Sequence, residues 1–314
     1  MFAKISGFEF RYQLRQPIFW IALLLFALLA FGSVASSNIQ LGSTDNIHKN
    51  AAFVIAQSCL IFAVLYMFVV VAFVANVIVR DDDTGFGAIV RTTPIRKFEY
   101  LYGRFAGAFC AAALAFLAVP IGLWLGSLAP WVDKETLGPL MLGDYVYAYV
   151  VLALPILFLS SALFFTLTTL TRSMMWTYVG LIALLVLRSV FAVVLSKPGL
   201  EHVAALWEPF GTSAFGAATR YWTASERNAL TPPIAGDLLW NKVLWLGVAC
   251  GALALAHRLF SFQSAERSGR RRGPSPAVEP AVVRRDFAEP VAGLAKPSFG
   301  AGATWAQLWA RTQL

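Results

Sequence analysis

The chain has 314 residues, of which 58% are hydrophobic and only 13% charged, and its formal net charge is +8. Soluble domains carry roughly 25% charged residues, so this composition excludes a soluble globular protein and indicates an integral membrane protein. The basic excess does not indicate nucleic-acid binding, because the lysines and arginines are divided among the flanks of apolar segments instead of forming one patch.

Residues 1–17 are predicted to form an interfacial amphipathic helix. Basic side chains, Arg11 among them, lie on one face, as in helices that lie along a membrane surface. Pro17 suits an elbow into the first span. A frayed basic flank is the alternative. The apolar side chains that recur at three- and four-residue spacing, and so share the other face, are Phe2, Ile5, Phe8 and Tyr12.

Six apolar runs are long enough to cross about 30 Å of hydrocarbon. We therefore expect residues 18–258 to be an all-α transmembrane domain. The second run is longer than a span requires, so it should tilt or project past the membrane surface. The six runs are residues 18–36, 52–79, 105–128, 146–171, 174–195 and 239–257.

Lysine and arginine are concentrated in alternate connections. The N-terminus, the 80–104 insert, the turn at Arg172 and the start of the tail are rich in them, whereas residues 37–51 and 129–145 contain one lysine each. Because positive charge favours the cytoplasmic side, both termini are predicted to be cytoplasmic.

Residues 80–104 form a charged insert between the second and third runs. Three consecutive aspartates, Asp81, Asp82 and Asp83, are predicted to begin a short helix, where backbone N–H groups favour negative charge. Thr93-Pro94 is predicted to start a second helix. The alternative is a solvated loop that carries the usual inward positive charges.

Small residues recur four apart in the third and sixth runs. Such spacing lets helix backbones approach closely in lipid, so we predict helix packing at these positions. The glycines concerned are Gly103, Gly107, Gly122, Gly126, Gly247 and Gly251.

The apolar runs contain no Asp or Glu. Intramembrane carboxylates are the usual carriers in proton- or cation-coupled transport, so a self-powered secondary transporter is disfavoured. Arg188 and Lys242 are the clear charges inside the runs, and snorkelling to the outer surface explains both. A substrate contact by either is the alternative.

The last two connections differ in character. Residues 196–238 are rich in Trp, Phe, Pro and Gly and are expected to form short helices or a re-entrant piece in the outer interface. An anchoring belt without a further role is the alternative. Residues 259–303 are predicted to be a flexible linker. Residues 304–314 turn amphipathic again and faintly echo the start of the chain, as the start of a possible second half would.

The sequence contains no recognisable catalytic or nucleotide-binding motif. The sequence has no GxxxxGK[ST] phosphate loop and no HExxH motif. His48, His202 and His257 are isolated, so neither a metal site nor a cofactor is expected. A transmembrane domain that has no energy source of its own must be driven by a partner, or it transports nothing.

The insert resembles a segment of type-2 ABC transporter permeases. The shared pattern is an acidic cluster, then Thr93-Pro94-Ile95-Arg96, Glu99-Tyr100-Leu101 and Gly103-Arg104. In that family this segment is a coupling helix that docks on an ATPase subunit, and the resemblance covers about residues 1–258. The residues that it implies for this contact are Asp81, Asp82, Asp83, Phe86, Arg96, Lys97, Phe98 and Tyr100, with a second contact from Phe2, Phe8 and Arg11.

A narrower resemblance lies in the outer connection. Glu208-Pro209-Phe210-Gly211 and Leu239-Trp240-Asn241-Lys242 look like the first half of large bacterial permeases fused to a zinc aminopeptidase domain. The peptidase motif and the second half are missing here, so no peptidase activity is implied.

The two resemblances together imply a multi-pass permease subunit of an ATP-driven exporter in a bacterial inner membrane. Its partners would be an ABC ATPase subunit, a second permease half or a homodimer partner, and membrane lipid. The alternative is a non-transporting membrane scaffold or anchor whose basic tail recruits partners. A channel ranks third, because no selectivity-type loop or array of gating charges is present.

Overall fold

The structure is a computed structural model that describes residues 1–36, 46–83, 95–195 and 199–260. These residues contain helices and no strand. All of them lie in the first of the two units of the chain, Met1–Ala265. Phe86, Thr93-Pro94, residues 261–303 of the predicted linker and the 304–314 segment lie outside the described residues, as do the side chains of Asp82 and Asp83.

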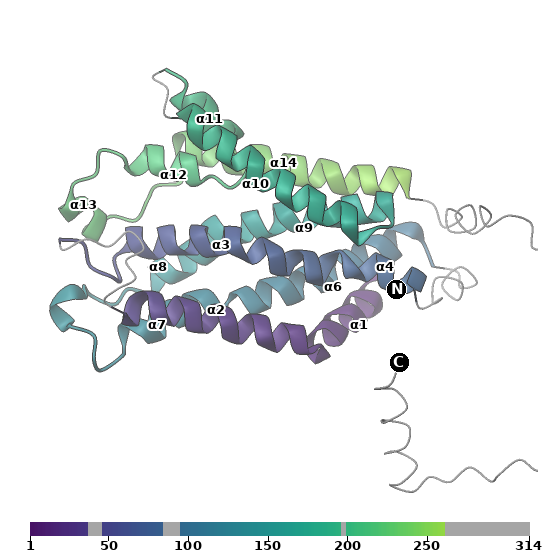
Figure 1. Cartoon of the computed structure of the whole chain (residues 1–314), viewed down its shortest axis with the longest axis horizontal. Coiled ribbons are helices and arrows are strands. Elements are labelled where there is room, and N and C mark those ends of the chain that lie inside the picture. Colours follow the sequence, from purple (N-terminus) through teal and green to yellow (C-terminus); the bar gives the residue numbers. More distant parts are fainter. Residues whose placement is uncertain (37–45, 84–94, 196–198, 261–314) are drawn as a thin grey trace, which may run out of the picture. The chain divides into compact units, whose positions relative to one another are not determined.

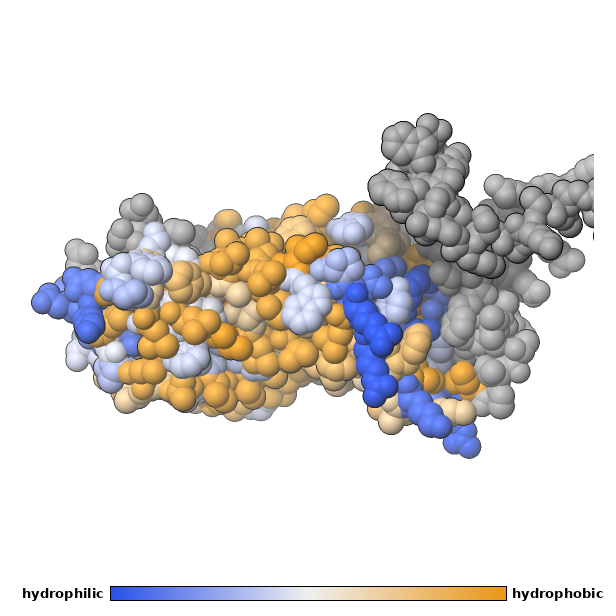
Figure 2. All heavy atoms as spheres, turned by 90° about the horizontal axis from the view of Figure 1, so that it is seen from below, coloured by the Kyte–Doolittle hydropathy of each residue, from blue (hydrophilic) through white to orange (hydrophobic). Residues whose placement is uncertain are grey.

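Six helices are long and apolar enough to cross a membrane, which confirms the six predicted spans. Hydrophobic side chains cover the middle of the face shown in Figure 2, and hydrophilic ones gather toward its ends. The chain is therefore a multi-pass membrane protein, and the secondary structure of its described residues is helical throughout. Its spans are Pro17–Ala35, Ala52–Asp81, Lys97–Ser127, Leu142–Thr171, Met174–Phe191 and Gly236–Leu259.

Several spans are broken into two or three helical pieces. In chain order, the spans are α2 (Pro17–Ala35), α3 (Ala52–Val74) with α4 (Asn76–Asp83), α6 (Lys97–Phe116) with α7 (Ala118–Ser127), α8 (Leu142–Tyr147) with the π-helix Ala148–Ala153 and α9 (Leu154–Thr171), α10 (Met174–Leu195) and α14 (Gly236–Leu259).

The second span is the centre of the bundle. In its most apolar stretch 72% of the residues are buried, whereas in the corresponding stretch of the fifth span, which includes most of α10, only 11% are. α3 contacts α2, α6, α7, α9 and α10 (Figure 1). The second span can be apolar on almost all sides because other helices, not lipid, surround most of it.

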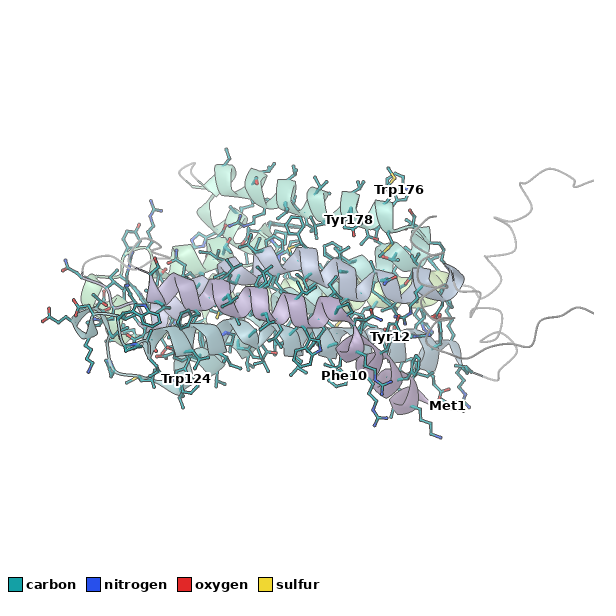
Figure 3. All side chains as sticks on the ribbon, turned by 60° about the horizontal axis from the view of Figure 1, so that its bottom comes forward. Met1, Phe10, Tyr12, Trp124, Trp176 and Tyr178 are labelled. Carbon is teal, nitrogen blue, oxygen red and sulfur yellow. The ribbon has the colours of Figure 1, made fainter. Side chains whose placement is uncertain are left out.

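Two ends of the bundle are used as landmarks. The Met1 end holds α1 (Phe2–Arg15) and the end of α4, and the far end holds α7 and α13 (Ala224–Ala229) (Figure 1). α1 and α2 meet at Gln16, which is extended, with Pro17 in the first turn of α2. α1 therefore leaves the direction of α2 at this elbow (Figure 3).

Four of the six predicted packing glycines lie under another helix. A Cβ on Gly107 would lie 2.6 Å from the Ser6 carbonyl oxygen of α1, and one on Gly122 would lie 2.5 Å from the Ala27 carbonyl oxygen of α2. Gly103 and Gly126 meet the same two helices. At Gly107, Gly122 and Gly126 a Cβ would lie within 2.8 Å of a backbone oxygen, so only glycine permits these three approaches.

The other two predicted packing glycines behave differently. Among the described residues, nothing lies within 4 Å of a Cβ built on Gly247 or Gly251. Both glycines are exposed and contact no other described helix, so helix packing at these two positions stays a prediction.

The structure also corrects the predicted insert helices. Asp81, Asp82 and Asp83 are the last described residues of α4, which continues the second span, so they do not begin a separate helix. α6 begins at Lys97, with Arg96 extended at its N-cap, and runs on as the third span. Ile95 and Arg96 are not helical, so within the described residues the predicted second helix begins at Lys97.

The connection between the fifth and sixth spans contains three short helices, α11 (Glu201–Trp207), α12 (Thr212–Thr219) and α13. Short helices were one of the two forms expected here. α12 contacts α14, and α13 contacts α3. The connection thereby covers the far end of two spans.

Candidate functional site

A buried ion cluster joins three helices at the Met1 end. It consists of Glu9 on α1, Arg80 and Asp81 on α4, and Arg104 on α6. Arg104 donates hydrogen bonds to Glu9 and to both oxygens of Asp81, with Nη2 lying 2.9 Å from Oδ1 and 2.6 Å from Oδ2. Arg80 Nη2 donates to Glu9 Oε2 over 2.8 Å. We name these four residues the ion cluster.

Neutral side chains complete the coordination of the carboxylates. The Tyr100 hydroxyl donates to Asp81 Oδ2 over 2.8 Å. Gln13 donates both to Glu9 Oε1 and to the Phe73 carbonyl oxygen of α3. The Arg80 guanidinium lies 4.0 Å from the centre of the Tyr12 ring, which Figure 3 labels on α1.

The sequence places these groups together through helix periodicity and small residues. Glu9 and Gln13 are four apart, so they share the face of α1 that meets α6. A Cβ on Gly107 would lie 2.7 Å from Glu9 Cβ, so this glycine lets α1 come close enough for Glu9 to reach Arg104. Arg80 and Asp81 lie in α4, at the end of the second span.

The ion cluster is electrically balanced and almost dry. Glu9 is fully buried, Arg104 is 3% exposed and Asp81 is 4% exposed. Two guanidiniums face two carboxylates, so no net charge is buried. Buried ions are tolerated only when they are paired and hydrogen-bonded. Each helix of the three therefore depends on the others to keep its charge neutralised.

Next to the ion cluster lies an exposed aromatic and basic surface. Phe2 is 39% and Phe98 is 56% exposed, and their ring centres are 6.4 Å apart. The N-terminal amino group pairs with Glu99 at 3.3 Å, which ties the tip of α1 to the start of α6. We name the exposed set the Met1-end surface; its members are Phe2, Phe8, Arg11, Arg96 and Phe98.

The predicted contact residues divide into two groups. The side chains of Asp81 and Tyr100 are buried in or beside the ion cluster, so in this structure they cannot touch a docked protein. This corrects their assignment as direct contacts. Lys97 is half-buried, and its amino group donates to the Arg258 carbonyl oxygen over 3.3 Å.

Sequence reasoning missed the ion cluster as a unit. The sequence pattern predicts only that the 80–104 insert is basic, and it assigns no contact to Glu9, which binds Arg80 and Arg104 in the structure. The available signal was an acid, four residues before Gln13, in a segment that is predicted to be an aromatic and basic interfacial helix. The second span also extends further than predicted and includes Asp81. Because Asp81 is paired, it is not a free intramembrane carboxylate.

A polar anchor holds the connection between the last two spans at the far end. Asn241 Nδ2 donates to the carbonyl oxygens of Ala205, Leu206 and Glu208, at 2.9, 3.1 and 2.7 Å. Gly211 has φ +74°, and a Cβ there would lie 2.8 Å from Asn241 Oδ1. The two segments of the narrower resemblance are thus in direct contact.

Lys242 belongs to the same anchor. It is only 8% exposed, and its amino group donates to the carbonyl oxygens of Leu152 and Phe210, at 3.3 and 3.0 Å. The prediction that Lys242 snorkels to the surface is therefore wrong, because the side chain turns inward to backbone acceptors. Its role here is to hold the π-helix Ala148–Ala153 and the Phe210 turn together.

In the ranges that the structure describes, no group of three or more His, Cys, Asp or Glu side chains could hold a metal ion. The ion cluster can transmit movement between helices, and the Met1-end surface can be bound. Comparison with models of known protein families found no match, and neither did comparison with curated protein sequences.

Proposed function

We propose that this chain is the membrane subunit of an ATP-driven exporter and that a separate ABC ATPase drives it from the Met1 end. In this proposal the Met1 end faces the bacterial cytoplasm, and a second permease half or a second copy completes the transporter. The resemblance of the insert to type-2 ABC permeases is one support. The arrangement of the ion cluster is the other, and it carries the argument.

The ion cluster supports the proposal because it makes one mechanical unit of three chain segments. α1 lies at the membrane surface, α4 leads into the insert, and α6 is the start of the third span. Separating any of them would leave a buried charge without its partner, which costs about 3–5 kcal/mol. A push on α1 or on the insert is therefore passed to the second and third spans together.

The Met1-end surface has the composition of a docking site. Exposed aromatic rings with flanking arginines are typical of the residues that dominate protein–protein binding. Phe2, Phe98 and Arg96 come from the tip of α1 and the start of α6, which are the two segments that the ion cluster fastens. A partner bound there would hold the moving unit directly.

The energy for transport must come from outside this chain. The sequence carries no phosphate-binding loop, and Asp81 is occupied by Arg104. The test is to isolate the tagged full chain from native membranes in mild detergent. We expect an ATPase subunit to accompany it and the complex to hydrolyse ATP. A fully folded chain that is isolated without an ATPase and without hydrolysis would refute the proposal and favour the scaffold.

A further inference from the structure

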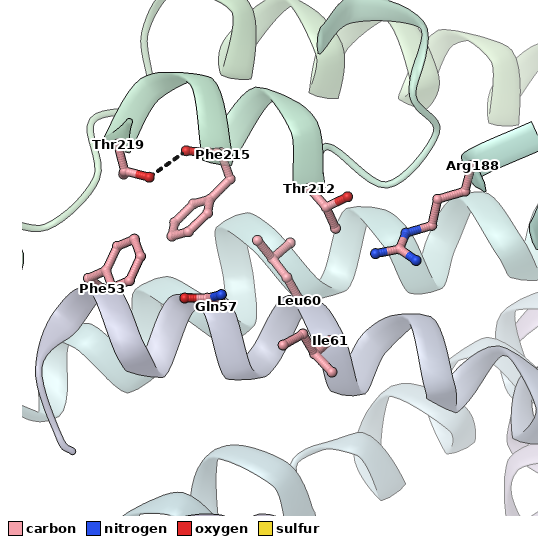
Figure 4. A pocket seen from close by; sticks show the side chains of 9 residues that line it. Phe53, Gln57, Leu60, Ile61, Arg188, Thr212, Phe215 and Thr219 are labelled. Carbon is pink, nitrogen blue, oxygen red and sulfur yellow. Dashed lines mark hydrogen bonds between the residues drawn. The ribbon is translucent and has the colours of Figure 1, made fainter. Parts of the chain in front are cut away.

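A cavity lies at the far end between α3, α10 and α12. Its volume is about 250 Å³. Side chains of all three helices line it, and the Arg188 side chain extends from α10 toward the space between the other two (Figure 4). Ligand pockets usually measure about 300–1,000 Å³. A cavity of this size suits the head of a molecule whose remainder lies outside it.

One side of the cavity carries the Arg188 guanidinium, whose side chain is 39% exposed. Its ion pair with Glu208 is long, because Nε lies 4.0 Å from Oε1. Each Glu208 oxygen already accepts a backbone N–H, from Phe210 at 3.2 Å and from Ser213 at 3.1 Å. Arg188 Nε is buried and has no hydrogen-bond partner among the described residues. An anionic oxygen in the cavity would supply that partner.

A second polar atom in the cavity is also unsatisfied. Gln57 Oε1 of α3 is buried and accepts no hydrogen bond within the described ranges. A buried acceptor of this kind favours a ligand with a donor. Together with Arg188, it selects a head group that has an anionic oxygen and a neighbouring hydroxyl.

An apolar stripe leads away from the cavity along α3. Gln57, Ile61, Leu65 and Phe68 follow one another at helical spacing, so they share a face. Gln57 and Ile61 line the cavity, whereas Leu65 is 47% and Phe68 is 54% exposed. Ile61 to Phe68 spans about 10 Å along the helix axis. The stripe runs toward the membrane interior, as a lipid chain does.

We propose that this cavity binds an anionic phospholipid with a hydroxylated head group, taken sideways from the membrane leaflet at the far end. Its phosphate pairs with Arg188, its hydroxyl donates to Gln57, and its acyl chain lies on Leu65 and Phe68. Charge, hydrogen-bonding groups and the direction of the stripe all agree on this ligand. The inference does not depend on the ATPase-driven function, since binding needs no turnover.

The test measures lipid binding to the full chain, isolated with any subunits that accompany it. Dioleoyl phosphatidylglycerol and dioleoyl phosphatidylcholine are titrated separately, and bound lipid is counted by native mass spectrometry. We expect the wild type to prefer the anionic lipid by about tenfold. Arg188→Gln should remove this preference, and Arg188→Lys should keep most of it.

Two further variants keep the test decisive if Arg188→Gln does not fold. Gly216 lines the cavity, and nothing lies within 4 Å of a Cβ built on it. Gly216→Leu adds an apolar side chain to the exposed part of the cavity lining, without a clash at its Cβ, and should reduce the preference. Lys134→Gln removes a charge from an exposed residue at the same end and should change nothing.

Three results would overturn the proposal. The first is an unchanged lipid preference in both Arg188→Gln and Gly216→Leu. The second is equally tight binding of inorganic phosphate, which would show that the head group alone is recognised. The third concerns Leu65→Gln. If the wild type is a dimer and this variant is a monomer that still binds the lipid, the stripe contacts a second copy of the chain and not an acyl chain.

Discussion

Glu9 and Arg104 are 95 residues apart in the sequence and form an ion pair that is closed off from water. This pair joins a surface helix to a membrane span. Arg104 uses its other terminal nitrogen for Asp81, so one guanidinium on α6 reaches both α1 and α4. The mechanical coupling that we propose depends on this shared arginine.

Removing the charge of Glu9 should destabilise the fold strongly. In Glu9→Gln, two buried guanidiniums face one carboxylate, which costs about 3–5 kcal/mol and lowers the melting temperature in detergent by on the order of 10 °C. Glu135→Gln removes an acid from an exposed position and serves as the control. An equal melting temperature for Glu9→Gln and the wild type would show that the cluster adds no stability.

The ion cluster should also show coupling between its members. The double variant Glu9→Met with Arg104→Met removes one charge of each sign and leaves Arg80 with Asp81. We expect its loss of unfolding free energy to be smaller than the sum of the two single losses. A sum that is simply additive would mean that Glu9 and Arg104 stabilise the fold independently.

Gly107 should be needed for α1 to dock on α6. In Gly107→Val the side chain meets the Ser6 carbonyl and Glu9 Cβ, both within 2.7 Å of the new Cβ. We expect α1 to detach, so that a cysteine placed at Gln13, now only 3% exposed, reacts readily with a thiol reagent. Gly247→Val, where space is open, should leave this cysteine protected. Equal protection in both variants would contradict the packing role of Gly107.

The orientation in the membrane can be tested with described, exposed residues. In a variant that lacks its own cysteines, Ser225→Cys at the far end should be labelled from outside the cell. Lys4→Cys at the Met1 end should be labelled only after permeabilisation, because the positive-inside pattern places it in the cytoplasm. The reverse pattern would place the ATPase and the Met1-end surface on opposite sides and end the proposal.

The spans could be predicted from the sequence, whereas the contacts that hold the helices together could not. Hydropathy alone finds each span, because an apolar run of this length has no alternative to a membrane or a core. The ion cluster depends instead on the docking of α1, since only that contact turns Glu9 from a surface acid into a buried one. Spacing likewise cannot separate Gly107 from Gly251, because both fit the same motif and only the packing of α14 distinguishes them.

The prediction that the three aspartates begin a helix was wrong for a related reason. A run of aspartates favours a helix N-terminus when nothing else offsets its charge. Here Arg104, seven residues into α6, offsets the charge of Asp81 at the C-terminal end of α4. A tertiary ion pair therefore outweighed the local preference.

Reversing charge at the start of α6 should weaken the coupling without disrupting the fold. Arg96 is exposed and Lys97 half-buried, and neither belongs to the ion cluster. In Arg96→Glu with Lys97→Glu we expect normal membrane insertion and a loss of ATPase co-isolation of about tenfold or more, as for loss of interface hot spots. Lys134→Glu at the far end is the control. Full co-isolation by the double variant would remove Arg96 and Lys97 from the interface.

The most direct measurement is photo-cross-linking from Phe98, which is exposed on the Met1-end surface, in the complex isolated from native membranes. A photoreactive residue at Phe98 should link the chain to the ATPase subunit, whereas one at Tyr221, 84% exposed outside the Met1-end surface, should not. A link from Tyr221 and none from Phe98, in preparations that contain the ATPase, would contradict the claim that the chain is driven from its Met1 end.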